Sequence, residues 1–282
     1  MFKALIASLF LLLAHSSLAS HVMGGEITYK HLGNNNYQFE LVFYRDCNGA
    51  DVNAVSEILR VWNHPTLSSI AVLFVQRQDL SPNCNQVPGG AGPLLCGTGN
   101  NGGNGIGAIE KVIYRSAPVA LSGTPPAEGW VFTYENFSRS GSLTNLLNPS
   151  TYGITLAAKI FNLDLPDDSP VFNEDPNFVS CAGLPYQYNG AVSDANLDSL
   201  FFEFGVPYNN FPTGVYNPPL NPAPVPFAIG FNNLSPTPGT AFNPSNIPAV
   251  LNPLNGTLTF QSYSIGNFAV KISIKAYRQG VL

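Results

Sequence analysis

The feature that most constrains the fold is the alternation of apolar and polar side chains in short stretches separated by turn-forming residues. Residues 37–44 place large apolar side chains at every second position, and residues 25–29 follow a similar pattern. The two stretches flank the run Gly-Asn-Asn-Asn at 33–36. Because successive side chains of a strand point to opposite faces, this pattern predicts a β-hairpin.

The same pattern recurs along the first half of the chain. Glycine and proline together supply 26 + 24 = 50 of the 282 residues, and β-branched and aromatic runs lie between them. Period-two alternation predicts strands near 25–30, 37–46, 55–62, 70–77, 107–115, 130–135 and 151–161. No stretch sustains the apolar spacing of an amphipathic helix, so helix is expected to be minor. Seven strands in roughly 140 residues are typical of a β-sandwich of immunoglobulin size.

The character of the chain changes near residue 164, where an acidic, proline-containing connector begins. Strand-like stretches return at 200–204, 256–260 and 268–277. Between them, residues 207–253 hold 12 of the 24 prolines. Since proline cannot donate a hydrogen bond to a strand, this insert is expected to be an irregular or polyproline-like surface segment. We therefore predict an all-β protein of two β-sandwich units, at 20–163 and 164–282.

The N-terminus carries the features of an export signal. Lys3 precedes an apolar run from residue 4 to residue 14, and Ser17-Leu-Ala19 matches the small-residue pattern of a cleavage site. The apolar run is too short to cross a bilayer as a helix, and no later run is long enough. The sequence therefore predicts a removed signal peptide at 1–19, a secreted protein and no transmembrane segment. A net charge of −5 disfavours nucleic acid as a partner.

Four cysteines lie in the exported part, and an even number in an oxidising compartment favours disulfides. Cys84 and Cys96 flank a Pro/Gly run inside the loop predicted at 79–106, so we expect them to pair. Cys47 and Cys181 would then join the two halves of the chain. Metal binding by these cysteines is not expected, because no CxxC or HxxxH spacing is present.

Several short motifs follow one another along the mature chain, at 21–29, 44–49, 129–134, 169–172, 188–200 and 275–280. In this order they resemble the N-terminal module of gliding-motility-associated surface proteins, which bacteria export by type IX secretion. The resemblance covers nearly all of the mature chain. The resemblance implies a non-catalytic surface module, an adhesin or structural spacer of a larger protein, on the outer surface of a Gram-negative bacterium. Its partner would be a cell-surface or extracellular glycan or protein.

In the family pattern a return strand follows the Tyr-Arg-x-Gly turn, which lies at 277–280 in this sequence. Only Val281 and Leu282 follow that turn here. The resemblance therefore implies that the second unit is C-terminally truncated. It also implies an unpaired edge on the strand at 268–277, and unpaired strand edges favour association.

A candidate calcium site lies at the beginning of the second unit. Asp194, Asn196 and Asp198 place oxygen side chains at alternate positions, and calcium binds six to eight such oxygen ligands. This run is similar to the calcium-binding run of cadherin-like bacterial modules, which implies a cadherin-like second unit. Three connector carboxylates could complete the shell: Asp164, Asp167 and Asp168. The alternative is an Asx-type turn, in which the carboxylates accept hydrogen bonds from local backbone amides.

Other candidate functional residues are fewer. Ser199, in Asp-Ser-Leu, fits the short O-glycosylation pattern of related bacteria, although its hydroxyl could instead bond within the turn. The aromatic residues Tyr208, Phe211 and Tyr216 of the insert could cap the edge of the sandwich or bind glycan or protein. A carbohydrate-binding module is therefore the alternative function. A secreted hydrolase is not expected, because no nucleophile elbow, zinc motif or phosphate loop is present.

Overall fold

The computed structural model describes residues 22–82, 94–97, 102–105, 107–137, 139–176, 179–211 and 222–282. The predicted signal peptide, Cys84 and Tyr216 lie outside these residues. The prediction of an all-β fold is confirmed, and the described residues contain a single short 3₁₀ turn, Pro149–Thr151. No helix in this part of the chain has the length and apolar character needed to cross a membrane.

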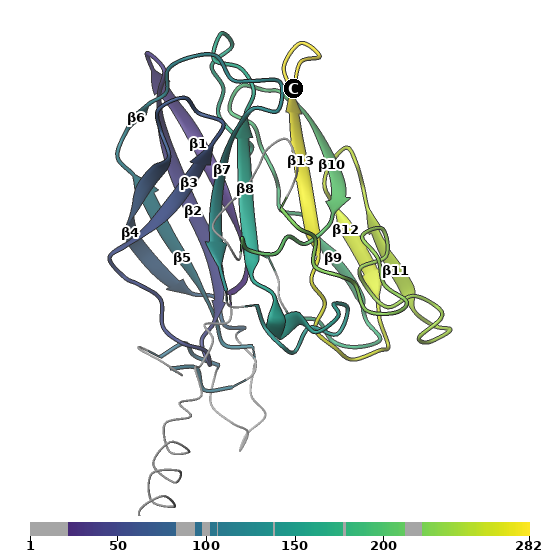
Figure 1. Ribbon diagram of the computed structural model, residues 1–282. Coiled ribbons are helices and arrows are strands. Elements are labelled where there is room, and N and C mark those ends of the chain that lie inside the picture. The colour runs from purple at the N-terminus through teal and green to yellow at the C-terminus, as the bar shows by residue number, and fades with distance from the viewer. Residues whose placement is uncertain are drawn as a thin grey trace, which may run out of the picture.

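The first half of the chain forms one antiparallel sheet, and it contains all seven strands that the alternation predicts (Figure 1). In spatial order its strands are β1 (Val22–Gly33), β2 (Asn36–Asp46), β5 (Ile109–Ser116), β4 (Ser69–Asp79), β3 (Ser56–Trp62), β7 (Trp130–Asn136) and β8 (Ile154–Ile160). A short strand, β6 (Val119–Ala120), adds to β2. The first two strands form the predicted hairpin, with Ile27 opposite Leu41.

This sheet curls until its two edge strands, β1 and β8, lie next to each other. The Tyr29 hydroxyl donates to the backbone carbonyl of Lys159 on β8 (3.1 Å). At Gly25 on β1, an added Cβ would lie 2.4 Å from the Val42 carbonyl oxygen and 2.9 Å from the Leu156 side chain of β8. Only a glycine therefore fits at this close approach. The strands of the first half therefore form one nearly closed sheet instead of the two separate sheets of the predicted sandwich.

The core inside this sheet is built from aromatic side chains at alternate positions of its strands. Phe39 and Phe43 of β2 are fully buried, and so are Trp130 and Phe132 of β7. The rings of Phe39 and Phe132 lie 4.5 Å apart between centroids, which is within the range of favourable aromatic packing. Strand period two thus places the large side chains of distant strands in one interior.

The second half of the chain forms two smaller antiparallel sheets (Figure 1). One contains β11 (Ile247–Leu251), β12 (Leu258–Gln261) and β9 (Pro185–Tyr188), and the other pairs β10 (Ser199–Gly205) with β13 (Lys271–Tyr277). The sequence predicted β10, β12 and β13 but missed β9 and β11.

Strand β11 lies inside the proline-rich insert that was predicted to be irregular, so that prediction is wrong for Ile247–Leu251. Its pairing with β12 shifts register between Ile247 and Val250, the stretch that contains Pro248. Proline is tolerated in a strand at an edge or at such an irregularity, because the missing N–H is not needed there.

The disulfide in the structure joins Cys47 to Cys96, whose Cα atoms are 5.3 Å apart. Both predicted pairings, Cys84 with Cys96 and Cys47 with Cys181, are therefore wrong. Cys181 is an exposed free thiol. The sheet explains the pairing: Cys47 directly follows β2, and Gly103 donates its N–H to the Cys47 carbonyl while it bridges to Cys96. The fold thus brings Cys96 to the end of β2.

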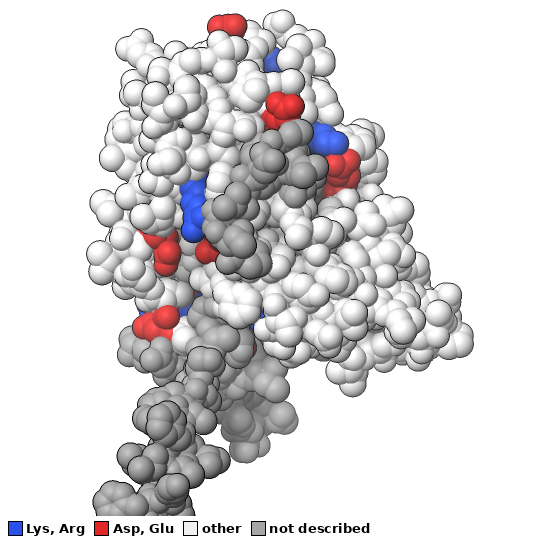
Figure 2. Space-filling view, viewed as in Figure 1, with Lys and Arg blue, Asp and Glu red and all other residues white. Residues whose placement is uncertain are grey.

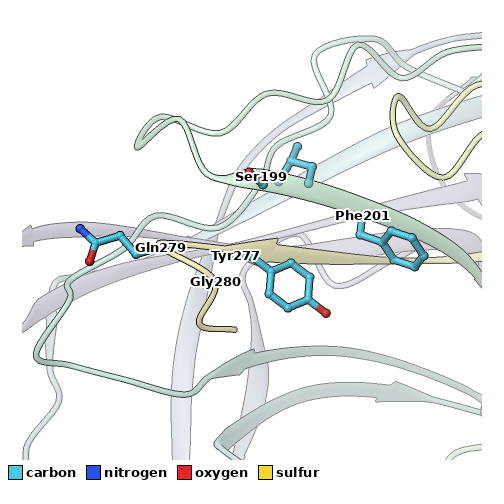
Figure 3. A pocket seen from close by; sticks show the side chains of 6 residues that line it. Ser199, Phe201, Tyr277, Gln279 and Gly280 are labelled. Carbon is cyan, nitrogen blue, oxygen red and sulfur yellow. The ribbon is translucent and has the colours of Figure 1, made fainter.

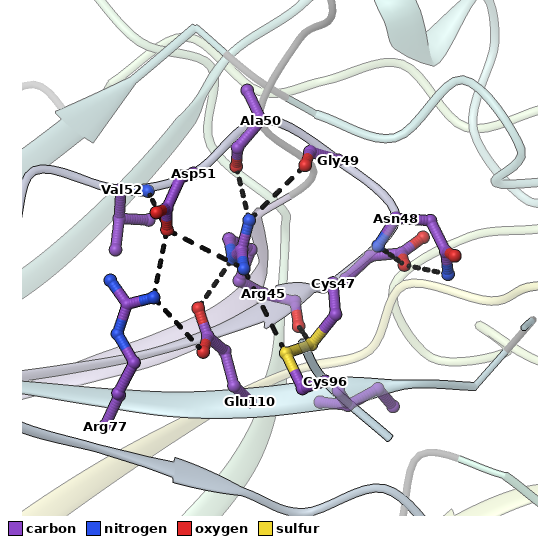
Figure 4. A network of polar contacts seen from close by, with 12 residues as sticks. Arg45, Cys47, Asn48, Gly49, Ala50, Asp51, Val52, Arg77, Cys96 and Glu110 are labelled. Atoms are coloured by element: carbon purple, nitrogen blue, oxygen red, sulfur yellow. Dashed lines mark hydrogen bonds and ion pairs between the residues drawn. A yellow bond between two sulfur atoms is a disulfide. The ribbon is translucent and has the colours of Figure 1, made fainter. Parts of the chain in front are cut away.

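A buried charge network surrounds this disulfide (Figure 4). The Arg45 side chain has no exposed surface, and its Nε donates to Glu110 Oε1 (2.7 Å). Its Nη1 donates to the carbonyls of Gly49 (3.3 Å) and Ala50 (2.7 Å). Asp51 lies 3.8 Å away and also accepts from Arg77. A buried guanidinium needs this many partners, because each of its N–H groups that lacks an acceptor would be a desolvated, unsatisfied donor of a charged group.

Replacing Cys96 with Ser should lower the free energy of unfolding by about 4 kcal/mol, because the disulfide closes a loop of 49 residues in the unfolded chain. Denaturant titration measures this change. The matched control is Cys181→Ser, which should leave stability unchanged because that thiol is exposed and free. Non-reducing peptide mapping should recover Cys47 linked to Cys96, and a Cys47–Cys181 peptide would contradict the structure.

Candidate functional site

The fold brings three of the predicted acidic residues together. Carboxylate oxygens of Asp167, Asp194 and Asp198 all lie within 4.8 Å of one another. Asp167 comes from the connector after β8, and the other two come from the turn that leads into β10. We call this group, together with Arg278, the acidic cluster.

The turn before β10 is organised by Asp194. Its Oδ1 accepts hydrogen bonds from the backbone N–H groups of Asn196 (2.9 Å) and Asp198 (3.1 Å). Leu197 has a φ of 63°, a left-handed conformation that the turn requires at this position. The Asx-type turn, which the sequence suggested as the alternative to calcium, is thus present. It also places the Asp198 carboxylate at the start of β10.

Hydrogen bonds hold the connector to β1 and to the turn before β10, and they use two of the predicted calcium ligands, Asp168 and Asn196. The His31 N–H donates to Asp168 Oδ1 (2.7 Å), and the Asp168 N–H donates to Asn196 Oδ1 (2.9 Å). Next to them, the Ser169 N–H donates to the Tyr29 carbonyl (2.9 Å). One side-chain oxygen each of Asp168 and Asn196 therefore accepts a hydrogen bond from a backbone amide, which is the role that the Asx-type alternative predicted for such oxygens.

Asp164 is exposed, and it does not belong to the three-carboxylate group. Its backbone N–H donates to the side chain of Asn162 (2.8 Å). Of the six predicted ligands, the fold thus gathers three, uses two as backbone acceptors and leaves one at the surface.

The cation of the acidic cluster is Arg278, to which the sequence analysis gave no role. Its Nη2 lies 2.6 Å from Asp167 Oδ1, and its Nε lies 2.9 Å from Asp198 Oδ1. Its Nη1 donates to the Pro166 carbonyl (2.8 Å). One guanidinium, following β13, therefore ties the connector to the start of β10.

A charge count could have pointed to Arg278. Residues 164–282 contain only three basic residues: Lys271, Lys275 and Arg278. The lysines are four residues apart on one predicted strand and so share one face. The arginine lies beyond them in a turn, and arginine is the residue best suited to bind two carboxylates at once.

The acidic cluster carries more negative charge than Arg278 neutralises. Asp194 is only 8% exposed, and the side chain of Asp198 is 4% exposed. Asp194 Oδ2 and Asp198 Oδ2 are nevertheless without a hydrogen-bond partner. Burial, and next the neighbouring Asp198 carboxylate, raise the pKa of Asp167 to about 7, against the opposing effect of Arg278. Three carboxylates with one arginine therefore favour uptake of further positive charge, as a proton or as a cation.

The chemistry of these donors suits a hard divalent cation. The unpartnered atoms are carboxylate oxygens, which are the ligands that Ca²⁺ prefers. The Arg278 guanidinium already binds one oxygen each of Asp167 and Asp198, so an ion would use the remaining oxygens.

The other predicted residues lie apart from the acidic cluster or at its edge. Ser199 is exposed, and it lines an open hollow of about 540 Å³ with Phe201 and Tyr277 (Figure 3). The Tyr208 ring lies under the Lys271 ammonium, 3.2 Å from centroid to nitrogen, and burial lowers the pKa of Lys271 to about 8. Phe211 packs edge-on against Trp62, with ring centroids 5.7 Å apart.

Comparison of this chain with models of known families, with characterised proteins and with solved structures finds no match.

Replacing Arg278 with Gln should lower the free energy of unfolding by about 2 kcal/mol, because it leaves the buried Asp198 carboxylate and the half-buried Asp167 without their cation. The matched control is Lys275→Gln on the preceding strand. Lys275 pairs with Glu203, and both side chains are well exposed, so its loss should cost less than about 1 kcal/mol. Equal losses in the two variants would show that Arg278 does not hold the cluster together.

Proposed function

We propose that this chain is a secreted, non-catalytic surface module that serves as an adhesin or structural spacer of a larger adhesion or gliding protein. The family resemblance of its motifs and the export signal in its sequence support this assignment. Under this proposal the two halves of the chain correspond to two units related to immunoglobulin-like and cadherin-like modules. The first has closed its strands into a single curled sheet.

The observation that carries the proposal is the way in which the two halves are joined. The connector hydrogen-bonds to β1 through Asp168 and Ser169, and Arg278 binds carboxylates from both the connector and the turn before β10. Side chains from three separate parts of the chain therefore fix the junction. A junction held by several charge-assisted hydrogen bonds resists bending, which a spacer on a moving cell surface requires.

The surface is consistent with an extracellular role. Figure 2 shows one face on which charged side chains are few and scattered, with no broad patch of either sign. Only 10% of all residues are charged. Such a surface has little long-range electrostatic attraction for charged partners, and its contacts would depend on local shape and hydrogen bonding.

A carbohydrate-binding module is the second candidate, because Tyr208 and Phe211 are aromatic residues that remain partly exposed. Both rings, however, already have intramolecular partners in Lys271 and Trp62. We therefore expect a glycan array to show no binding that depends on these rings. The control is Tyr263, an exposed tyrosine outside the predicted site. Reproducible binding that is lost in Tyr208→Ala and Phe211→Ala, but kept in Tyr263→Ala, would favour the carbohydrate-binding function instead.

The adhesion proposal itself is tested with the exported chain fixed on beads under flow. The beads should attach to a surface that carries the polymer or protein to which the chain binds. The chain on the beads should not hydrolyse that polymer or protein. Turnover on a broad panel of polysaccharides and peptides would overturn the proposal. Failure to attach to any extracellular polymer or protein would limit the role to that of a spacer.

We also propose that calcium binds the acidic cluster and stiffens the junction. The specific observation in its favour is the pair of buried, unpartnered oxygens, Asp194 Oδ2 and Asp198 Oδ2. Calcium at a hundredfold excess over its Kd should stabilise the folded chain by about 2.7 kcal/mol, measured as a rise in Tm relative to chelator.

The control for calcium is Asp194→Asn, which keeps an oxygen for the two backbone amides of the turn but removes the charge. This variant should fold and lose most of its response to calcium. Identical melting curves of the unaltered chain in calcium and in chelator would contradict calcium binding. The Asx-type turn and the ion pairs of Arg278 would then account for the arrangement of the acidic cluster.

A further inference from the structure

A lysine and an aspartate meet on the outer face of the curled sheet. Phe43 and Val112 point into the core, so their neighbours Tyr44 and Lys111 point outward. Lys111 Nζ lies 2.6 Å from an oxygen of Asp175, Oδ1, and the Tyr44 hydroxyl donates to the same oxygen (3.2 Å). No other described residue binds the second oxygen of this carboxylate, Oδ2. Two donors therefore converge on one oxygen and leave the other without a partner.

The backbone holds both side chains in place. Lys111 lies on β5, which pairs with β2 on one side and with β4 on the other. Just before Asp175, the N–H groups of Asn173 and Glu174 both donate to the carbonyl of Gly190 (3.0 and 3.1 Å). The Lys111 amine thus lies against the carboxyl group of Asp175. Groups fixed in this way can react as if at a concentration of about 10⁵ M or more.

A second acid, Glu26 of β1, lies on the same face beside Tyr44. Glu26 is opposite Val42 in the hairpin, and Tyr44 is two residues further along β2, so the two side chains are diagonal neighbours. Among the described residues, no hydrogen bond holds the Glu26 carboxylate. Burial raises the pKa of Glu26 to about 7, although the charge of Lys111 opposes this change. An acid that titrates near neutral pH can both accept and donate a proton.

We propose that Lys111 and Asp175 form an amide bond between their side chains, with Glu26 as the proton carrier. The Lys111 ammonium gives one proton to the Glu26 carboxylate, and the neutral Nζ attacks Asp175 Cγ. The Tyr44 hydroxyl stabilises the negative charge that develops on Oδ1. The bond from Cγ to Oδ2 then breaks, and Oδ2 leaves as water with one proton from Glu26 and one from Nζ. The third proton of the ammonium stays on the amide, Glu26 is again a carboxylate, and no oxidant or reductant is needed.

This bond would join the curled sheet to the second half of the chain, across a separation of 64 residues. As an ion pair alone, the contact would add little, because the side chains of Lys111 and Asp175 are 20% and 31% exposed. The pair of Lys275 with Glu203, 2.9 Å apart, serves as an internal comparison. No carboxylate other than Glu203 acts on Lys275, so this pair lacks a proton carrier and should stay an ion pair.

The test is the intact mass of the exported chain, measured after reduction and denaturation. The unaltered chain should be one water molecule lighter than its amino-acid sequence requires. Proteolysis followed by tandem mass spectrometry should recover a branched peptide in which Lys111 is linked to Asp175, whereas Lys275 should be unmodified. A full mass for the unaltered chain would overturn the proposal, and so would a linkage at Lys275 as frequent as that at Lys111.

Two variants separate the chemistry from the ion pair. Lys111→Arg keeps a cation beside Asp175, but a guanidinium is always protonated and does not attack, so this variant should have its full mass. Glu26→Gln keeps the size of the side chain but cannot carry the proton, so most molecules should also have their full mass. Circular dichroism shows whether each variant is folded. Loss of water from Glu26→Gln to the same extent as from the unaltered chain would contradict the role of Glu26, and loss of water from Lys111→Arg would place the reaction elsewhere and overturn the proposal.

Discussion

The structure depends most on the closure of one antiparallel sheet around an aromatic core. Phe39, Phe43, Trp130 and Phe132 come from two strands that are about 90 residues apart in sequence, and all four are fully buried. Burying rings of this size contributes more to stability than any polar contact in the protein. The sheet must curl to enclose them, and that curl brings β1 and β8 together. The connector docks on the edge of β1.

Two groups of ion pairs lie outside the aromatic core. Arg45 and Glu110 are buried beside the disulfide, at the end of β2, and Arg278 binds Asp167 and Asp198 at the junction of the two halves. Such pairs contribute little net stability when compared with apolar packing, because desolvation offsets most of the attraction. Their partners are nevertheless specific, so any other arrangement of these segments would leave buried charges unpaired.

Local patterns were sufficient to predict most of the strands but not their partners. The alternation in 37–46 depends only on the period of a strand, so β2 was predicted within one residue of its observed start. Strand β11 was missed because Pro248 argues against a strand, and only its pairing with β12 shows that the register shifts around it. The Cys47–Cys96 bond was also missed, because nearness in sequence favoured Cys84, whereas the fold places Cys96 at the end of β2.

The sequence by itself determined that the chain is β-rich, where most strands begin and end, and that Asp194 lies in a turn with oxygen side chains, because these properties depend on neighbouring residues. Only the tertiary structure decided that the first strands close into one sheet and that Arg278 is the cation of Asp167 and Asp198. Strand pairing joins residues that are far apart in the chain. The hydrogen bonds between paired strands are formed by backbone groups, so they depend little on which side chains the strands carry. The alternation of a strand therefore does not specify its neighbour.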